Sequence, residues 1–338
     1  MIPYNMYYYA VLVIKMGSLK ATVKSVLKPF VCPFKNNSGK KRFLGAATDT
    51  EASLEAIKNA EKIGIVAVKH TAFVAELLKE NLLALGVDCE IYLKEPKKYE
   101  DIPYIMICPQ NFKVFPKNFI AFQMEQTVNS RWLTDEYMEI LYNAQAVFDY
   151  SMVNIEFFSK DEKLKDKLFY LPIDVSKEKL NNVKTQQEKT LDLIFYGDPY
   201  IERRKEFLDK IGAKFNLKVI SNTFGQGLYN EMKRAKIIVN IHYYENALLE
   251  TTRLYEALSN SDCLIISEKS CDTNADQNLE NIVDFTPVGD IDFMLSRIEY
   301  WLNNNEERQK KASDNLQLLK NRNCETYNLL SLFFDNKT

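Results

Sequence analysis

The sequence predicts an α/β protein made of two domains, each with a mostly parallel sheet covered by helices on both faces. Short apolar runs typical of buried strands alternate with segments whose apolar residues recur at helical spacing. A polar stretch interrupts this alternation near the middle of the chain. The 338 residues suffice for two domains, and 46% hydrophobic residues suffice for two packed cores.

The first domain is expected at 45–172. Its predicted strands lie at 63–69, 88–93, 104–108, 119–124, 146–150 and 168–171. Its predicted helices lie at 53–62, 71–85, 137–142 and 153–158. Gly86 ends the second helix, because glycine adopts the left-handed conformation that often follows a helix. Alternating strands and helices of this kind favour a parallel sheet.

A linker is expected at 173–190, where lysine, asparagine and glutamine replace the apolar residues. The alternation then resumes in a second domain at 191–290. Its predicted strands lie at 191–196, 217–220, 237–241, 263–267 and 282–285. Its predicted helices lie at 201–214, 228–235 and 251–259. Residues 291–338 are expected to add two or three terminal helices.

Composition excludes several classes of function. A net charge of −2 gives no reason to expect a nucleic-acid partner. The six cysteines are scattered without a C-x-x-C pair, which favours a reducing, cytoplasmic compartment over a disulfide framework. Two histidines are too few for a typical zinc cluster.

Residues 1–44 form a basic and aromatic arm. Seven lysines and one arginine come between Lys15 and Arg42, before the first acidic residue, Asp49. The apolar stretch 7–14 is too short to span a bilayer. The arm could touch an anionic membrane surface, which would make the protein peripheral there. It could equally be an extension packed on the body with its lysines in solvent.

The most informative segment is 240–268, predicted as the end of a strand, an acidic connection, a helix and another strand. Ligands of α/β sheets bind beyond the carboxyl ends of strands, where helix N-termini offer free N–H groups to anions. At that position the sequence places polar and charged residues. They are Glu245, Glu250, Thr251, Thr252, Arg253 and Glu256. The alternative is an ordinary helix whose first turn is capped by acidic and hydroxyl residues.

This segment, with its Arg-x-x-Glu-Ala sequence at 253–257, resembles the donor site of glycosyltransferases with two Rossmann-like domains, the GT-B fold of group 1-like bacterial or viral enzymes. The resemblance implies that the helix N-terminus, Thr251 and Thr252 hold the diphosphate of a nucleotide sugar. It also implies that Glu256 holds the ribose, with Glu250 near the sugar hydroxyls. Whether such an enzyme retains or inverts the anomeric configuration stays open, because the spacing of the glutamates departs from that of the large retaining group.

Two further features of the second domain fit this resemblance. Gly197 allows a tight turn between the first strand and the first helix, and Arg203 and Arg204 follow it. The resemblance places this loop beside the diphosphate, where an arginine could bind in a bidentate manner. His242, just after a strand, could contact sugar or phosphate. The alternatives are a βα turn with two surface arginines and a histidine with a structural role.

In the first domain, Glu125 and Gln126 follow a strand end. A carboxylate there could deprotonate an acceptor hydroxyl, so Glu125 is the candidate catalytic base. The surrounding pattern resembles the N-terminal domains of uncharacterised bacterial and viral glycosyltransferases. Gln126 and His70 are candidate acceptor-binding residues. The alternatives are a solvated strand-end glutamate and, near His70, a helix cap shared with Thr71.

A metal is not expected. The D-x-D sequence at Asp290 and Asp292 begins a predicted helix near the chain end, so Asp290 is interpreted as an N-cap. We therefore expect no cofactor, the nucleotide sugar being a substrate.

The predicted function is that of a hexosyl- or related transferase. It would move a sugar from a nucleotide-sugar donor to a glycan or lipid-linked glycan. Two alternatives remain at this point: a binding protein that closes around a small ligand, and a sugar-nucleotide epimerase of the same fold. The binding protein is less favoured, because such proteins are usually exported and no export signal is apparent.

Overall fold

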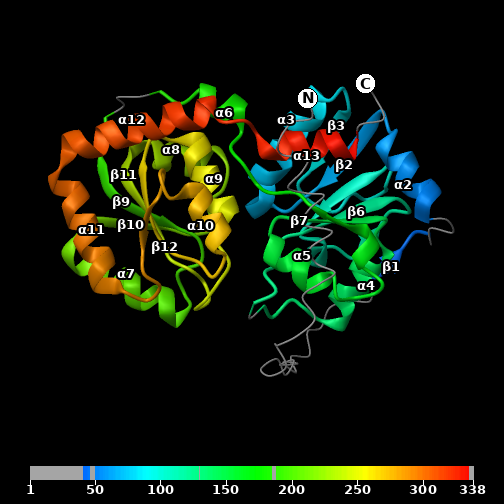
Figure 1. Cartoon of the computed structure of the whole chain (residues 1–338), viewed down its shortest axis with the longest axis horizontal. Coiled ribbons are helices and arrows are strands. Elements are labelled where there is room, and N and C mark those ends of the chain that lie inside the picture. The colour runs from blue at the N-terminus through cyan, green and yellow to red at the C-terminus, as the bar shows by residue number, and fades with distance from the viewer. Residues whose placement is uncertain (1–40, 46–49, 129, 185–187, 335–338) are drawn as a thin grey trace, which may run out of the picture. The chain divides into compact units, whose positions relative to one another are not determined.

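The computed structural model describes residues 41–45, 50–128, 130–184 and 188–334, and within them two separate parallel sheets carry the fold (Figure 1). The first sheet has the order β3-β2-β4-β6-β7-β8. Its strands are β2 (Lys62–Val66), β3 (Asp88–Tyr92), β4 (Tyr104–Ile107), β6 (Phe119–Gln123), β7 (Ala146–Asp149) and β8 (Leu168–Tyr170). Its helices are α2 (Thr50–Lys58), α3 (Ala72–Ala84), α4 (Asp135–Asn143) and α5 (Met152–Phe158).

Both faces of the first sheet are buried, which explains its continuous apolar strands. Ile105 and Ile107 of β4 join the same core cluster as Phe73 of α3. Tyr104 and Met106 of the same strand point the other way, into a core cluster that α4 completes. Alternation along one strand therefore fills two layers.

The second sheet has the order β10-β9-β11-β12-β13 and is also parallel. Its strands are β9 (Leu191–Tyr196), β10 (Leu217–Ile220), β11 (Ala235–Asn240), β12 (Leu264–Glu268) and β13 (Asp284–Thr286). Its helices are α7 (Glu202–Lys214), α8 (Gln226–Arg234), α9 (Thr251–Asn260), α10 (Thr273–Leu279), α11 (Ile291–Asn303) and α12 (Asn305–Asn321). The predicted α/β class with two Rossmann-like sheets is confirmed.

The last helix, α13 (Glu325–Phe333), packs against the first domain although it follows the second in sequence. Figure 1 shows it beside α3. Phe333 meets Phe148 and Phe169 edge to face, at ring-centroid distances of 4.9 and 4.8 Å. Aromatic pairs of this geometry stabilise beyond the area they bury. The predicted boundary at 291 therefore groups helices that pack against different sheets, and the predicted domain limits stay predictions.

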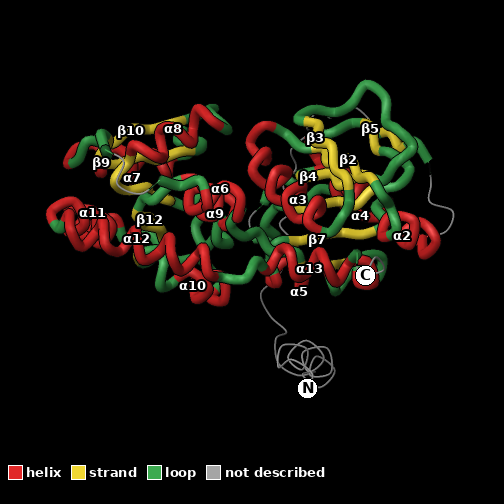
Figure 2. Tube along the Cα trace, turned by 90° about the horizontal axis from the view of Figure 1, so that it is seen from above, coloured by secondary structure: helices red, strands yellow, loops and turns green. Residues whose placement is uncertain are grey.

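The predicted linker contains a short helix, α6 (Lys177–Asn181), which lies against α9 (Figure 2). Ser176 caps it by accepting a hydrogen bond from the N–H of Lys179 at 3.2 Å. The Lys177 ammonium donates to the carbonyls of Leu319 and Lys320 at the end of α12, at 2.8 and 3.1 Å. The linker is thus fixed by side-chain hydrogen bonds and also by buried apolar residues that join a core cluster, namely Ile173, Val175, Leu180 and Val183.

Most of the basic arm, residues 1–40, lies outside the described residues. Its end is described: Lys41 donates to the carbonyls of Gln110 and Phe112, and β1 (Arg42–Phe43) pairs with β5 (Val114–Phe115). No helix among the described residues is long and apolar enough to cross a membrane.

Candidate functional site

Glu125 lies just beyond β6, and one buried side chain hydrogen-bonds to both its backbone carbonyl and its backbone N–H. The amide nitrogen of Gln123 donates to the Glu125 carbonyl at 2.7 Å, and the amide oxygen of Gln123 accepts from the Glu125 N–H. Gln123 has no exposed surface. A loop that would otherwise be free is therefore fixed at the residue predicted to be the base.

Gln123 is in turn held by other buried polar groups. It donates to the Asp149 carboxylate at 2.6 Å and accepts from the Tyr137 hydroxyl at 2.9 Å. Asn154 donates both to Asp149 and to the Glu125 carbonyl, each at 3.0 Å. Burial raises the pKa of Asp149 to about 8. A fully connected network of this kind specifies one loop conformation.

The Glu125 carboxylate accepts hydrogen bonds from the Gln110 amide at 2.6 Å and from the Ser130 hydroxyl at 3.3 Å. Burial raises its pKa to about 7, and the two hydrogen bonds and nearby Arg131 oppose this only in part. A base is most effective when its pKa lies near the working pH. Glu125 therefore has the protonation behaviour that general-base catalysis needs.

On the second domain, Glu250 is shared by two arginines. It accepts from Arg204 at 2.7 Å and from Arg253 at 2.6 Å. Burial alone would raise the pKa of Glu250, but the two guanidinium groups bring it down to about 2. Burial lowers the pKa of Arg204 to about 10, which leaves it charged at neutral pH. The cluster therefore carries two positive charges against one negative charge.

Gly197 brings the first βα turn of this domain close to the cluster. Its φ of +132° lies in the range that favours glycine, and a Cβ there would sit 3.3 Å from the Arg253 guanidinium. Arg204 also donates to the carbonyls of Asp198, in this turn, and of Ile241, at 3.1 and 2.9 Å. The turn and the arginine cluster thus form one unit.

Arg203 and His242 are hydrogen-bonded to other groups within the second domain. Arg203 binds the fully buried Glu268 through both carboxylate oxygens and donates to the His242 carbonyl at 2.9 Å. His242 has no exposed surface, and its Nε2 lies 3.0 Å from the Lys269 carbonyl oxygen. These contacts give both residues a scaffolding role beneath the loops, and direct contact with a substrate stays a prediction.

The N-terminus of α9 has no side-chain cap, since the N-cap residue Glu250 turns to the arginines instead. The buried hydroxyl oxygen of Thr251 has no hydrogen-bond partner among the described residues. Thr252 follows in the same half-buried first turn. The N–H groups of Thr251 and Arg253 donate to the carbonyls of Leu249 and Glu250, at 2.8 and 3.0 Å, so the helix dipole and the Thr251 hydroxyl are what favour an anion here.

Glu256, one turn further along α9, is surrounded by groups from other helices. Burial raises its pKa to about 7, although the nearby Tyr229 of α8 and the charge of Arg253 oppose this in part. Glu76 of α3 and Lys179 of α6 lie nearby and form an ion pair at 2.9 Å. The ribose-binding role of Glu256 stays a prediction.

The carboxyl ends of the two sheets meet at several points. Gln126 accepts a hydrogen bond from the Leu248 N–H at 2.9 Å. The rings of His70 and Phe224 lie 6.3 Å apart. The predicted acceptor residues therefore contact the second domain directly.

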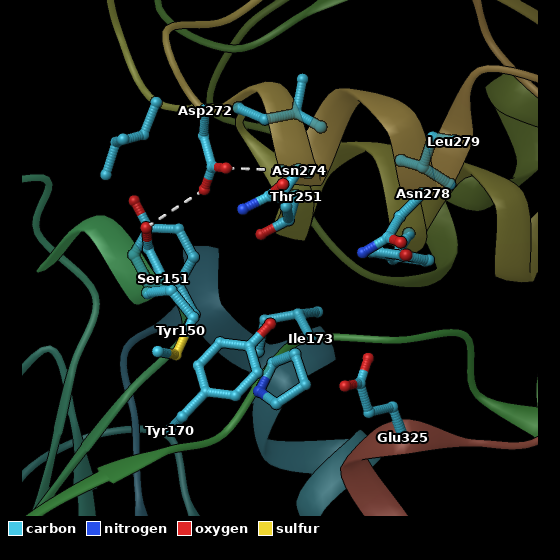
Figure 3. A pocket seen from close by; sticks show the side chains of 16 residues that line it. Tyr150, Ser151, Tyr170, Ile173, Thr251, Asp272, Asn274, Asn278, Leu279 and Glu325 are labelled. Atoms are coloured by element: carbon cyan, nitrogen blue, oxygen red, sulfur yellow. Dashed lines mark hydrogen bonds between the residues drawn. The ribbon is translucent and has the colours of Figure 1, made fainter. Parts of the chain in front are cut away.

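A small pocket lies where β7 and β8 end opposite α9 and α10 (Figure 3). The Ser151 hydroxyl lies 3.4 Å from Asp272 across it, and Tyr150, Tyr170 and Thr251 contribute to its lining. Its volume of about 50 Å³ holds little more than water. Pockets for whole ligands measure roughly 300–1,000 Å³. A nucleotide sugar approaching Thr251 from this side would need the pocket to widen.

The sequence did not identify the support of Glu125 by Asp149, Asn154 and Tyr137. One signal was available for Asp149, a carboxylate at the end of a buried apolar run. Asn154 and Tyr137 belong to separate helices, so only the fold brings them to Gln123. By contrast, the interpretation of Asp290 as an N-cap is confirmed, because its side chain accepts from the Phe293 N–H at 2.9 Å.

No protein-family model matches the sequence, and no curated protein matches it. Solved structures do share its fold. An α-glucosyltransferase in complex with UDP and a 13-mer DNA has a TM-score of 0.56 at 10% identity, covering 82% of this chain and 99% of its own. T4 phage BGT in complex with UDP and Mn²⁺ has a TM-score of 0.54 at 15% identity, covering 81% and 99%. Anabaena HepE in complex with UDP and glucose has a TM-score of 0.50 at 8% identity, covering 78% and 95%.

The expectation of no cofactor and no metal is corrected by one of these structures. T4 phage BGT was solved in complex with UDP and Mn²⁺, so the absence of a metal requirement does not follow from the position of the D-x-D sequence. Within the ranges that the structure describes, no group of three or more histidine, cysteine, aspartate and glutamate side chains could hold an ion by itself. Manganese therefore belongs among the components of any assay.

Likeness across about four-fifths of the chain, at 10 to 15% identity, is a likeness of fold. The chain therefore has the GT-B fold of nucleotide-sugar glycosyltransferases.

Proposed function

We propose that the protein is a glycosyltransferase that moves a sugar from a nucleotide sugar to a hydroxyl group of a glycan or lipid-linked glycan. One observation carries the proposal. Glu125, a carboxylate whose pKa is raised to about 7, is held rigidly beside Gln126, which hydrogen-bonds to the β11–α9 connection of the second domain. A base thus adjoins the segment that resembles a donor site.

The donor would bind through the second domain. Its diphosphate would meet the positive end of the α9 dipole and the hydroxyls of Thr251 and Thr252. The surplus positive charge of Arg204 and Arg253 over Glu250 would stabilise the departing diphosphate. The Gly197 turn would line the same position. UDP in the complexes of T4 phage BGT and Anabaena HepE supports a uridine donor as the first to test.

The ribose would contact Glu256. Arg203 and His242 would support the loops from below, and His70 and Gln126 would lie on the acceptor side. Neither the binding protein without catalysis nor the epimerase gains support from the structures that share the fold.

In the reaction, Glu125 would take the proton of the acceptor hydroxyl as its oxygen attacks the anomeric carbon. The bond between that carbon and the diphosphate oxygen would break, and its electron pair would leave with the nucleoside diphosphate. A single displacement of this kind inverts the anomeric configuration. Proton removal and charge stabilisation are the two contributions the chain's own residues would make.

We further propose a cytoplasmic location, with residues 1–44 touching an anionic membrane surface. The cationic residues of the arm and its aromatic side chains support this.

Replacing Glu125 by glutamine tests the proposal, because glutamine keeps the shape but not the basicity. Turnover with UDP-glucose and manganese should fall by about 10²- to 10⁴-fold. UDP affinity should not change, since Glu125 lies outside the donor domain. Glu299→Gln, on the exposed face of α11, is the matched control and should behave as the parent. Near-normal turnover in Glu125→Gln would contradict the assignment.

A further inference from the structure

The loop after β6 carries an aromatic residue, Trp132, whose backbone is linked to Glu125. Ser130 links the two, because its hydroxyl donates to the Glu125 carboxylate at 3.3 Å and accepts from the Trp132 N–H at 3.1 Å. Trp132 is partly exposed, and the guanidinium of Arg131 lies 5.2 Å from its ring. The position of Trp132 is therefore tied to the position of the candidate base.

Tyr244 reaches the same place from the second domain. The backbone of Arg131 hydrogen-bonds to its hydroxyl, and the charges of Arg131 and Glu125 act on it, although burial is the main reason that its pKa is raised. Tyr243 supports the Tyr244 ring edge to face, with centroids 4.8 Å apart. Two partly exposed aromatic residues, one from each domain, are therefore linked to Glu125: Trp132 through Ser130, and Tyr244 through Arg131.

We propose that Trp132 and Tyr244 form the acceptor subsite and that it takes a neutral sugar ring, so that the enzyme extends a glycan. This inference rests on the proposed function and names its acceptor. The C–H face of a sugar ring packs against flat aromatic side chains, while its hydroxyls need polar partners at the edge. Tyrosine and tryptophan offer both an apolar body and a polar tip, and Arg131 adds further donors.

The charge around Glu125 favours a neutral ring over a nucleic-acid acceptor. Three cations, Arg131, Arg204 and Arg253, balance three acids, Glu125, Glu245 and Glu250, and two of these cations are already paired with Glu250. Binding of DNA rests on several lysines and arginines that neutralise phosphates. An uncharged sugar has no such need.

The two tryptophans of the chain make binding directly observable. Trp301 is buried and donates to the Asp284 carboxylate, so its fluorescence should stay constant. Adding methyl glucosides, maltose or cellobiose to the UDP-bound protein should change the fluorescence of Trp132. Trp132→Phe should remove this signal but keep the stacking surface, and with it the acceptor KM.

Trp132→Ala should raise the KM for the sugar acceptor by about tenfold, because the stacking contact is lost. Slow hydrolysis of UDP-glucose and affinity for UDP should not change. Phe293→Ala, which removes an exposed aromatic side chain from α11, is the matched control and should leave all three values unchanged.

The inference is overturned if Trp132→Ala keeps the parent KM, or if no sugar of this panel is used or changes the fluorescence. It is also overturned if transfer occurs only to DNA containing hydroxymethylated pyrimidines. Failure of the proposed function would look different: the parent protein would neither bind UDP nor hydrolyse UDP-glucose, with or without manganese.

Discussion

Glu125 combines two properties that work against each other in a folded protein. Gln123 and Asn154 fix its backbone, while burial makes its charged form unfavourable. The same carboxylate therefore has a fixed position, as a base requires, and a charged form that costs stability. Both consequences can be measured.

The first consequence is a pH dependence of activity. A base works when it is ionised, so kcat/KM should decrease as the pH falls below about 7, the pKa of Glu125. A profile measured from pH 5 to 9 with UDP-glucose and a sugar acceptor should show this decrease. In Glu125→Gln the residual activity should lose it. A parent profile flat between pH 5 and 7 would rule out Glu125 as the base.

The second consequence concerns stability. The pKa of Glu125 is about 7 in the folded protein but near 4.5 in an unfolded chain, so the folded state holds a proton more tightly. Its favourable contribution is fully present below about pH 4.5 and is lost as the pH rises through 7. Glu125→Gln should therefore raise Tm at pH 8 and change it little at pH 4.5. Equal Tm values at pH 8 would contradict the raised pKa.

At this scale the sequence indicated the strand-end position of Glu125 but not the side chains that support it. The strand-end position of Glu125 is a local feature and could be read directly. Its raised pKa depends on burial, and its rigidity depends on Gln123 and Asp149; both arise only from tertiary packing. The ion pair between Arg203 and Glu268 likewise forms only through tertiary packing.

Among the elements, α9 concentrates the predicted donor contacts at its first two turns. Its N-terminus is uncapped, and Glu256 projects toward Tyr229 from the next turn. This arrangement separates the group that would bind phosphate from the group that would bind ribose. A substitution at the phosphate-binding group therefore leaves the ribose-binding group in place, and the reverse also holds.

Glu256→Ala should weaken UDP binding by about 1–3 kcal/mol, the cost of losing a hydrogen bond to a charged group. Calorimetric titration with UDP measures this. Glu299→Ala serves as the control, because that exposed glutamate lies on α11. An unchanged affinity in Glu256→Ala would remove the ribose assignment.

Glu250→Ala tests the arginine cluster. Arg204 is only 4% exposed and would lose its carboxylate partner. Removing one partner of a buried ion pair costs about 3–5 kcal/mol, so urea unfolding should show a loss of this size. Asp209→Asn breaks the exposed Lys205–Asp209 pair instead and should cost less than about 0.5 kcal/mol. Equal losses in the two variants would contradict a structural role for Glu250.

Elements with apolar periodicity were predicted to within a few residues, and those without it were missed. The strand predicted at 191–196 is β9, and the helix predicted at 71–85 is α3 at Ala72–Ala84. By contrast, α10 has the polar sequence TNADQNL and α6 lies within the expected linker. Both begin at side-chain caps, Asp272 and Ser176, and both are too short for a helical period to be recognised.

At the scale of the whole molecule, α13 ties the end of the described chain to the first sheet. Phe333 is 7% exposed and packs against Phe148 and Phe169. Phe333→Ala should lower the free energy of unfolding by about 3–5 kcal/mol, as for other buried phenylalanines. Leu332→Ala changes the 67% exposed neighbour and should have little effect. Calorimetry of both variants measures the difference, and equal transitions would contradict the packing.

The two-domain α/β architecture could be predicted because it depends on patterns that repeat along the chain. The return of α13 could not, because its apolar residues suit a helix on either sheet. The same limit applies to the contacts between the sheets, such as Gln126 with Leu248, which join residues far apart in sequence.

The position of α13 also sets an order of events during synthesis. Phe148 and Phe169 leave the ribosome before Phe333, their partner in the finished fold, and the nearer of the two, Phe169, precedes it by about 160 residues. At roughly 5–20 residues per second, that interval lasts about 8–30 seconds. Throughout it the first sheet has an uncovered apolar patch in a crowded cell. Chaperones could bind the uncovered patch during this interval. The first domain is completed only after the second domain has been synthesised.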